Sequence, residues 1–303
     1  MSKTILFFGN ERLATGVITN TPLLNELVLN GYKVAAIIIV PTHLSASRRP
    51  RPLEVSVFAA SNNIPLVEIA NLKQASAELK TFKAELGILA AFGKIIPQEI
   101  IDIFPLGIIN IHPSLLPKHR GPIPIEAPIL AGEAETGVSL MQLVAAMDAG
   151  PIYDQVSISL SGTESKQQLA DQLGVLGAQR LIAILPKVIS GELKPRQQAG
   201  DATYDTKISP AQSRLELTKP AIQLDREIRA FLGWPRSRIT IKGVPIIVTK
   251  AHAADNPQST AGIYKTSDGL ALTTKDGVLI IDRLIAAGSK EMSAIDYLRG
   301  HPL

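Results

Sequence analysis

Three polar residues close or follow apolar runs in the first half of the chain, and their side chains could act together in catalysis. Asn110 and His112 end the run GIINIH, and Asp148 lies shortly beyond the run GVSLMQL, within VAAMDAGPIYDQ. An amide, an imidazole and a carboxylate suit a reaction that builds negative charge on an oxygen atom while a proton moves. We predict that these three residues are catalytic. The simpler alternative is a strand end that carries two solvated polar residues.

Other kinds of active centre lack their usual residues in this sequence. The chain has no cysteine and no Gly-x-Ser-x-Gly motif, so its residue pattern does not support a covalent nucleophile. It has no His-x-x-x-His motif, and the glycines of FFGNERLATG lack the spacing of a dinucleotide-binding loop. We therefore expect neither a metal ion nor a dinucleotide at the site.

Apolar runs that alternate with helical patterns predict an α/β domain around the candidate residues. Such continuously apolar runs are typical of parallel strands covered by helices on both faces, and they span residues 4–9, 34–40, 86–92, 107–112 and 137–143. Ligands of these sheets bind beyond the carboxyl ends of the strands. Because side chains alternate along a strand, Asn110 and His112 should share one face at that end. We predict a Rossmann-like, mostly parallel sheet with helices on both faces.

The last third of the chain predicts a second, all-β domain. After a long helix that Thr163 should cap, the stretch 190–208 collects glycine, proline and polar residues, which is typical of a linker. The turns IKGV, SDGL and KDGV then separate short alternating strands, as in a small barrel or sandwich. We therefore expect a catalytic domain over 1–189, a linker over 190–208 and an OB-like C-terminal β-barrel over 209–303.

Composition and charge narrow the environment and the partners. The 303 residues are 46% hydrophobic, which is enough for two cores. The start MSKTILFF does not resemble a signal peptide, and no apolar stretch approaches the ~18 residues of a membrane span, so we expect a cytoplasmic protein without a membrane partner. Residues 1–190 hold 15 basic and 15 acidic side chains, whereas residues 191–303 hold 16 basic and 12 acidic ones. A basic C-terminal domain suits a phosphate-rich partner.

The sequence around the candidate residues resembles the folate-dependent formyltransferases. INIHPSLLPKHRGPIP and GEAETGVSLMQLVAAMDAGPIYDQ contain the family's Asn-x-His, Ser-Leu-Leu-Pro-x-x-Arg-Gly, Thr-Gly-Val and Asp-x-Gly elements, in order and at family spacing. The resemblance implies transfer of a formyl group from 10-formyltetrahydrofolate to an amine, without a metal. It assigns catalysis to Asn110, His112 and Asp148.

The resemblance also implies a mechanism and a folate site. Asn110 and His112 would donate hydrogen bonds to a tetrahedral oxyanion, while Asp148 would orient the imidazole and assist proton transfer. The turn after His112 and the segment AAFGKIIP look like the parts that line the family's folate site. The implied folate-binding residues are Ser114, Leu115, Leu116, Pro117, Phe92 and Ile95.

Two branches of the family carry a C-terminal domain, one that formylates methionyl-tRNA and one that formylates sugar nucleotides. The segments ATYDTKIS, REIRAFLGWPRSRIT and AAGSKEMSAIDYLRG look like motifs of the tRNA branch. The resemblance thus implies initiator methionyl-tRNA and folate as partners, with no obligate protein partner. The open alternatives are a formyltransferase for an amino-sugar nucleotide and a catalytically inactive RNA-binding relative.

The arginines expected to meet the tRNA lie in two places. The segment VPTHLSASRRPRPLE matches the basic loop of the tRNA branch, although it lacks the usual Asp-Arg-Pro start. It contributes Arg48, Arg49 and Arg51, and the basic stretch of the C-terminal domain contributes Arg236 and Arg238. A further departure is His119, at a position where the family commonly has an aromatic or another residue.

Overall fold

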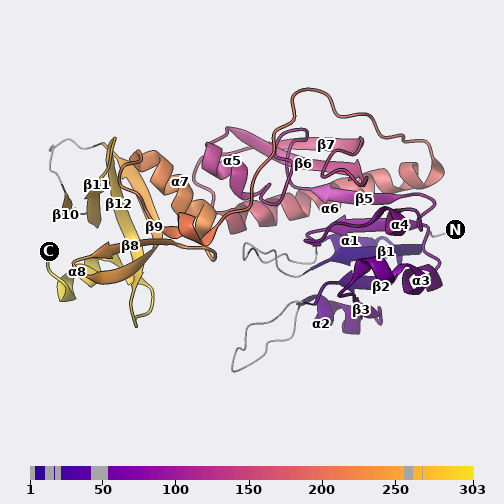
Figure 1. Cartoon of the computed structure of the whole chain (residues 1–303), viewed down its shortest axis with the longest axis horizontal. Helices are drawn as coiled ribbons and strands as arrows, with labels where there is room; N and C mark the ends of the chain where they lie inside the picture. Colours follow the sequence, from indigo (N-terminus) through magenta and orange to yellow (C-terminus); the bar gives the residue numbers. More distant parts are fainter. Residues whose placement is uncertain (1–3, 11–16, 18–21, 42–53, 256–261, 268) are drawn as a thin grey trace. The chain divides into compact units, whose positions relative to one another are not determined.

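The computed structural model describes residues 4–10, 17, 22–41, 54–255, 262–267 and 269–303 (Figure 1). The chain forms two compact units, neither of which is a single continuous segment. Unit 1 consists of Met1–Pro124, Glu135–Ser159 and Gln168–Thr206. Unit 2 consists of Ile125–Ala134, Leu160–Gln167 and Lys207–Leu303. Two short pieces that lie between segments of unit 1 thus belong to the C-terminal unit.

Unit 1 is built on a seven-stranded sheet in the order β3-β2-β1-β4-β5-β6-β7. Strands β1 to β5 pair in parallel, which confirms the predicted mostly parallel sheet. The pairs β5–β6 and β6–β7 are antiparallel, so β6 runs against the other strands, a direction that an apolar run does not reveal. The strands are β1 Thr4–Gly9, β2 Lys33–Ile39, β3 Leu66–Glu68, β4 Leu86–Ala90, β5 Ile108–His112, β6 Glu135–Gln142 and β7 Ile152–Ser159.

Helices cover both faces of this sheet. On the face that includes Ile108, helices α3 and α4 bury Leu79 and Ile100 in one core with Leu6 and Phe8. On the opposite face α6 lies so close to β5 that a Cβ at Gly177 would come within 2.8 Å of Ile111. The helices of this unit are α1 Pro22–Leu29, α2 Glu54–Ser61, α3 Ser76–Thr81 and α4 Gln98–Ile101, with a 3-10 turn at Leu72–Gln74. Helix α6, Lys166–Ser190, begins in unit 2 and continues through unit 1.

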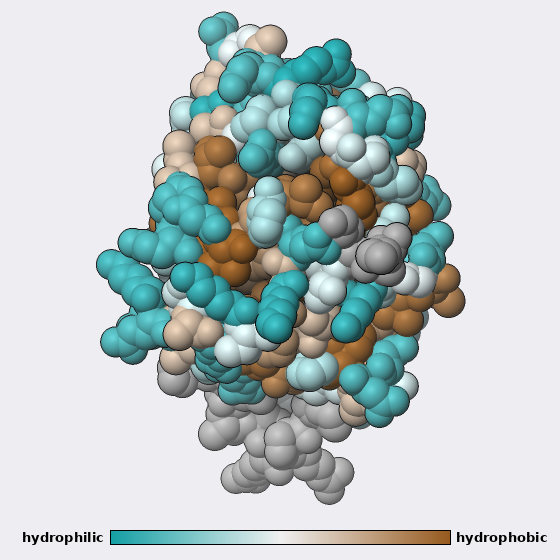
Figure 2. All heavy atoms as spheres, turned by 90° about the vertical axis from the view of Figure 1, so that its right-hand side faces the viewer, coloured by the Kyte–Doolittle hydropathy of each residue, from teal (hydrophilic) through white to brown (hydrophobic). Residues whose placement is uncertain are grey.

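Helix α6 corrects one expectation from the sequence. By length and composition it could cross a membrane, so the chain does contain an apolar stretch of that size. The helix has the apolar stripe of a core helix, however, with Leu169, Leu173, Leu181 and Leu185 all buried. These buried leucines line one face of the helix, as in a helix that packs in a protein core. On the face of the molecule shown in Figure 2, hydrophilic residues predominate and hydrophobic residues lie between them in separate patches.

Unit 2 contains a curled antiparallel sheet in the order β10-β11-β12-β9-β8, with β13 paired to β12 (Figure 1). This sheet corresponds to the predicted C-terminal barrel, and in the described residues its pairing path runs openly from β10 to β8. The strands are β8 Ser237–Ile241, β9 Val244–Ala254, β10 Ile263–Lys265, β11 Leu270–Thr273, β12 Val278–Ala286 and β13 Met292–Ser293. The helices are α5 Glu126–Ala131, α7 Ala221–Phe231 and α8 Ala294–Gly300, with a 3-10 turn at Pro210–Ser213.

The predicted hairpins explain how this sheet forms. The turn IKGV joins β8 to β9, with positive φ angles at Lys242 (46°) and Gly243 (80°), as a type I′ turn requires. The turns SDGL and KDGV lie between β10 and β11 and between β11 and β12, as predicted. Inward side chains of these strands, including Ile246, Leu279 and Ile281, form an apolar core with α7 and α8.

A buried ion pair joins the two short pieces of unit 2. The Lys166 and Glu126 side chains are only 3% and 1% exposed, with Nζ and Oε1 3.7 Å apart. Lys166 Nζ also donates a hydrogen bond of 2.9 Å to the carbonyl oxygen of Trp234. Burial lowers the pKa of Lys166 to about 8, against the attraction of the Glu126 carboxylate, which raises it. This pair was not predicted from the sequence.

Candidate active site

Asn110 and His112 lie at the carboxyl end of β5, where the sequence places them. Both are buried, with exposures of 6% and 5%, and strand alternation puts them on the face of the sheet that α3 and α4 cover. The chain then turns sharply, because Ser114 N–H donates to the carbonyl oxygen of His112. A solvated strand end is therefore excluded for these two residues.

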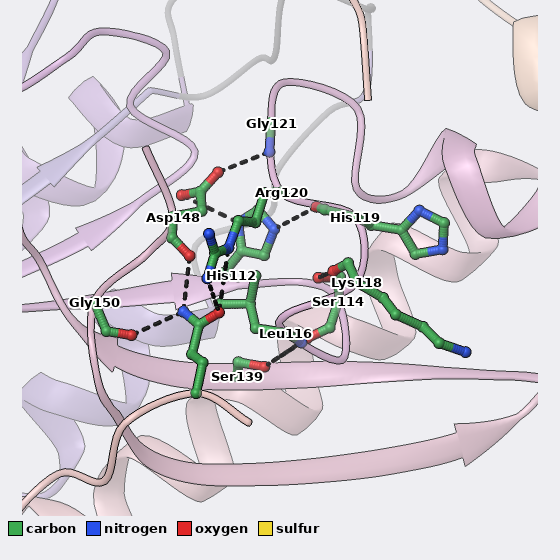
Figure 3. A network of polar contacts seen from close by, with 11 residues as sticks. His112, Ser114, Leu116, Lys118, His119, Arg120, Gly121, Ser139, Asp148 and Gly150 are labelled. Carbon is green, nitrogen blue, oxygen red and sulfur yellow. Dashed lines mark hydrogen bonds and ion pairs between the residues drawn. The ribbon is translucent and has the colours of Figure 1, made fainter. Parts of the chain in front are cut away.

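Each ring nitrogen of His112 faces a different group (Figure 3). Nε2 is 3.0 Å from the carbonyl oxygen of His119, which can only accept a hydrogen bond, so Nε2 carries the proton. Nδ1 lies 3.7 Å from Asp148 Oδ1, an ion-pair distance that is too long for a direct hydrogen bond. The His119 carbonyl thus orients the ring through Nε2, while the Asp148 carboxylate faces Nδ1. The role of Asp148 in orienting the imidazole stays a prediction.

Asp148 is held in a defined conformation beside this ring. Its Oδ2 accepts a hydrogen bond of 2.8 Å from Gly121 N–H, which leaves Oδ1 directed at His112 (Figure 3). The backbone of Asp148 has a φ angle of 47°, in the left-handed region that few non-glycine residues adopt. The structure therefore brings His112 and Asp148 together and fixes which carboxylate oxygen faces the ring.

The turn formed by Ser114, Leu115, Leu116 and Pro117 is held by hydrogen bonds between its backbone and side chains of β6 and β7. Leu116 N–H donates to Ser139 Oγ, which in turn donates to the carbonyl oxygen of Ser114 (Figure 3). Gln155 Nε2 donates to the carbonyl oxygen of Leu116. Strands β6 and β7 thus hold this turn rigidly next to His112.

The two other residues predicted to bind folate are placed very differently. Phe92 is buried and packs edge-on against Phe8, as part of the core between the sheet and α4. Ile95 is 73% exposed, two residues before the N-cap of α4. Their roles toward folate stay predictions.

The predicted tRNA-binding arginines are only partly described. Arg48, Arg49 and Arg51 lie outside the described residues. Arg236 and Arg238 are exposed in unit 2, at the start of β8, and Arg236 Nε donates to the carbonyl oxygen of Gly233. They do not take part in the His112–Asp148 arrangement.

The stretch 196–206, predicted to be a linker, is an ordered part of the site. Arg120 N–H donates to the carbonyl oxygen of Thr203, and Asp205 N–H donates to that of Arg120. His119 N–H donates to Thr203 Oγ1, and the His119 ring lies 3.0 Å from Asp205 Oδ2. We call residues 196–206 the strap. Sequence analysis identified ATYDTKIS, which overlaps the end of the strap, only as a motif and missed the contacts of the strap with the active-site loop.

The strap passes so close to the active-site loop that Gly121 must be a glycine. Its φ angle is 123°, and a Cβ there would lie 2.7 Å from the carbonyl oxygen of Asp205. The same glycine donates its N–H to Asp148. The Arg120–Gly121 pair was thus the signal in the sequence that could have revealed the contact with the strap, because a glycine in a loop often marks a close approach of two backbones.

Among the described residues, neither a group of metal-ligating side chains nor the cavity found beside β5 coincides with this arrangement. Among the described residues no group of three or more histidine or acidic side chains is placed to hold a metal ion. A cavity of about 760 Å³ opens at the other end of β5, lined in part by Gly107, Gln142 and Lys194. It includes none of the predicted catalytic or folate-binding residues.

Two family models together match most of the chain. Residues 14–185 match the family model described as formyl transferase, and residues 207–302 match the one described as formyl transferase, C-terminal domain. A methionyl-tRNA formyltransferase of Halorhodospira halophila is 33% identical over 309 residues, covering 100% of this chain and 98% of the relative. The enzyme of the same name from Chloroflexus aurantiacus is 33% identical over 305 residues, covering 98% and 96%.

Solved structures share the fold at lower identity. An N-formyltransferase of Helicobacter canadensis, solved with folinic acid and dTDP-3-aminofucose, has a TM-score of 0.68 and 18% identity, covering 96% of this chain and 100% of that one. HypX of Aquifex aeolicus, solved with tetrahydrofolic acid, has a TM-score of 0.68 and 16% identity over 98% of this chain. This chain spans 47% of HypX.

Proposed function

Because this chain belongs to the formyl transferase family, we propose that it transfers the formyl group of 10-formyltetrahydrofolate to the α-amino group of initiator methionyl-tRNA. The observation that carries the proposal is the placement of His112, whose Nδ1 edge faces the free oxygen of Asp148 at a buried strand end. The named relatives support methionyl-tRNA as the acceptor, because they match this chain over nearly its whole length.

The reaction joins the amine to the formyl carbon and breaks the bond from that carbon to N10 of the folate. The neutral amine attacks the carbon, and the carbonyl oxygen becomes a tetrahedral oxyanion. Asn110 donates a hydrogen bond to it. The His112 ring, in the protonated form that the Asp148 carboxylate favours, donates a second one from Nδ1–H, since Nε2–H is already engaged by His119. One such donor typically contributes ~2.7–4 kcal/mol to stabilisation of the transition state.

Asp148 acts on the proton that must leave the attacking amine. Its Oδ1 is the acceptor on the reaction side, because Oδ2 is occupied by Gly121 N–H. The carboxylate accepts the proton and N10 of the leaving folate receives it, directly or through a water molecule. The carboxylate also stabilises positive charge on the His112 ring while the oxyanion exists. Positioning and charge stabilisation therefore provide the catalysis.

The remaining predicted residues complete the proposal. Folate would lie along the rigid turn from Ser114 to Pro117, near Phe92 and Ile95. The tRNA phosphates would contact Arg236 and Arg238 of unit 2 and the basic segment with Arg48, Arg49 and Arg51. We further propose that the protein works in the cytoplasm, where charged tRNA is used. The proposed domains are a catalytic domain over 1–189, a linker over 190–208 and a tRNA-binding β-barrel domain over 209–303.

The test is an acceptor competition with the purified full chain. 10-Formyltetrahydrofolate is offered with methionyl-tRNA in one reaction and with dTDP-linked amino sugars in another, and the release of tetrahydrofolate and the formylated product are both measured. We expect formylation of methionyl-tRNA only. Formylation of the amino sugars alone would replace the proposed acceptor, and tRNA binding without any formyl transfer would reduce the protein to an inactive RNA-binding relative.

A further inference from the structure

We propose that Gln198 of the strap is a positioning residue for catalysis, because it fixes the backbone of Asp148 and links it to the loop that orients His112. Gln198 Nε2 donates to the carbonyl oxygens of Asp148 and Gly150, each at 2.8 Å. Its Oε1 accepts from Arg120, at 2.7 Å from Nη2 and 3.2 Å from Nε. The inference rests on the proposed role of Asp148 as the proton acceptor.

The four contacts use the whole hydrogen-bonding capacity of a carboxamide. An amide offers two donors on nitrogen and two acceptor positions on oxygen, and all four are satisfied here. Backbone carbonyls only accept and a guanidinium only donates, so the amide can fit in one orientation. Among side chains of this length, glutamate lacks the donors and methionine lacks both functions.

The contact at Asp148 acts where the backbone would otherwise relax. A residue with φ at 47° is strained by about 1 kcal/mol or more unless its surroundings hold it there. Gln198 holds the carbonyl of this residue, while Gly121 holds one oxygen of its side chain. Without Gln198 the peptide after Asp148 could rotate and move Oδ1 away from the His112 ring.

The contact at Arg120 connects this control to His112. Arg120 lies between His119, whose carbonyl orients the imidazole, and Gly121, whose N–H binds Asp148. Its guanidinium also donates to the hydroxyl of Tyr204, further along the strap. One amide therefore sets the distance between two loops that carry opposite sides of the reaction centre.

The experiment compares two variants of similar size in the full chain. Gln198→Met removes all four hydrogen bonds, whereas Gln198→Glu keeps the pairing with Arg120 and removes only the donors to the Asp148 loop. Gln197 is the matched control, because it is the neighbouring glutamine and is exposed. Gln197→Met and Gln197→Glu should behave as wild type.

We expect both Gln198 variants to lower kcat by ~10–100-fold, the scale on which a displacement of about 1 Å reduces rates. The KM for folate should stay within about twofold, and the pH profile of kcat should shift, because the spacing of Asp148 and His112 changes. Rates are measured with the amine that the wild type formylates as acceptor. Each rate is divided by the concentration of folded protein, which a folate-binding titration gives. Folding defects are thereby removed from the comparison.

The outcomes separate the inference from the proposed function. If Gln198→Glu keeps a wild-type kcat and pH profile, the amide serves only to anchor Arg120 and the inference is overturned. The same holds if both Gln198 variants lose activity only in proportion to their folded fraction. Failure of the wild type and the Gln197 controls on methionyl-tRNA would instead contradict the proposed acceptor, and the Gln198 comparison would then be made on the amine found.

Discussion

The interior around His112 and the interior of the curled C-terminal sheet are built in opposite ways. Around β5 the buried residues include Asn110, His112, Ser114, His119 and Ser139, and the adjoining backbone has positive φ angles at His119 and Asp148. In the C-terminal sheet the buried side chains are almost entirely apolar, such as Leu272, Leu279 and Ile281. The first interior holds polar groups and strain, whereas the second buries apolar surface.

This contrast teaches which property each interior supports. Buried polar groups cost free energy unless each is paired, so a region dense in them is retained for what it does. An apolar core provides the main favourable term in folding. Substitutions near His112 should therefore reduce rate more than stability, and those in the curled sheet should do the reverse.

The largest effect is expected for His112→Ala. Loss of one oxyanion donor should lower kcat by ~10²–10³-fold. The melting temperature should stay close to the wild-type value, because the His112 ring lies among polar groups and not in the apolar core. His252→Ala is the control, since that histidine is exposed on β9 and pairs with Asp282. Wild-type turnover in the His112 variant would contradict the expectation that substitutions near His112 reduce the rate.

The buried pair of Lys166 and Glu126 is an exception within unit 2, and pH should reveal it. The folded pKa of Lys166, about 8, lies below its ordinary value of 10.5 because of burial. Between these two values the unfolded chain binds more protons, so stability should rise with pH, by up to about 1.4 kcal/mol per pH unit.

Urea unfolding between pH 7 and pH 10 measures this slope. The comparison protein carries Lys166→Met together with Glu126→Leu, because removal of one partner alone would leave a buried charge unpaired. The wild type should gain stability relative to this double variant as pH rises through 8. Parallel curves for the two proteins would show that the pair does not titrate in this range.

A smaller effect on stability is expected for Ile281→Val in the apolar core. Deletion of one buried methyl group should cost ~0.5–1.5 kcal/mol, while kcat per folded molecule stays at the wild-type value. Ile263→Val provides the control, because that side chain is exposed on the edge strand β10. Urea unfolding and turnover are measured on the same samples. A fall in kcat with no loss of stability would contradict the division between the two interiors.

The smallest effect is expected at the surface of unit 2. Arg238→Gln should weaken binding of methionyl-tRNA slightly and reduce the log–log salt slope by about 0.7–0.9, the value for one phosphate contact. Arg299→Gln is the control, since this exposed arginine is paired with Asp296. Equal slopes for wild type and Arg238→Gln would exclude a phosphate contact at this position.

Sequence reasoning succeeded where the signal is local. The apolar run before Asn110 and His112 predicted the strand and the position of these two residues at its carboxyl end. The three glycine-containing turns of the C-terminal sheet were also predicted, because glycine is common in the tight turns between paired strands.

It failed where partners are distant in sequence. Gln198 reaches Asp148 across 50 residues and Arg120 across 78 residues, and no periodicity marks such pairs. A stretch of polar residues with glycine has the same composition whether it is a free linker or a strap held by hydrogen bonds. For the same reason the direction of β6 could not be deduced, since pairing depends on the neighbour and not on the run itself.

The composition of unit 2 from separate pieces also sets a time order for its assembly during synthesis. Helix α5 ends at Ala131, whereas its partner α7 begins at Ala221, about 90 residues later. At ~5–20 residues per second the ribosome needs roughly 5 to 20 s to make that stretch. During this interval α5, whose Ala127 and Ile129 are buried in the finished protein, lacks the helix that it contacts there. We expect chaperones to bind nascent chains that contain α5 but not yet α7. Slower elongation should therefore lengthen the time during which such chains can misfold or aggregate.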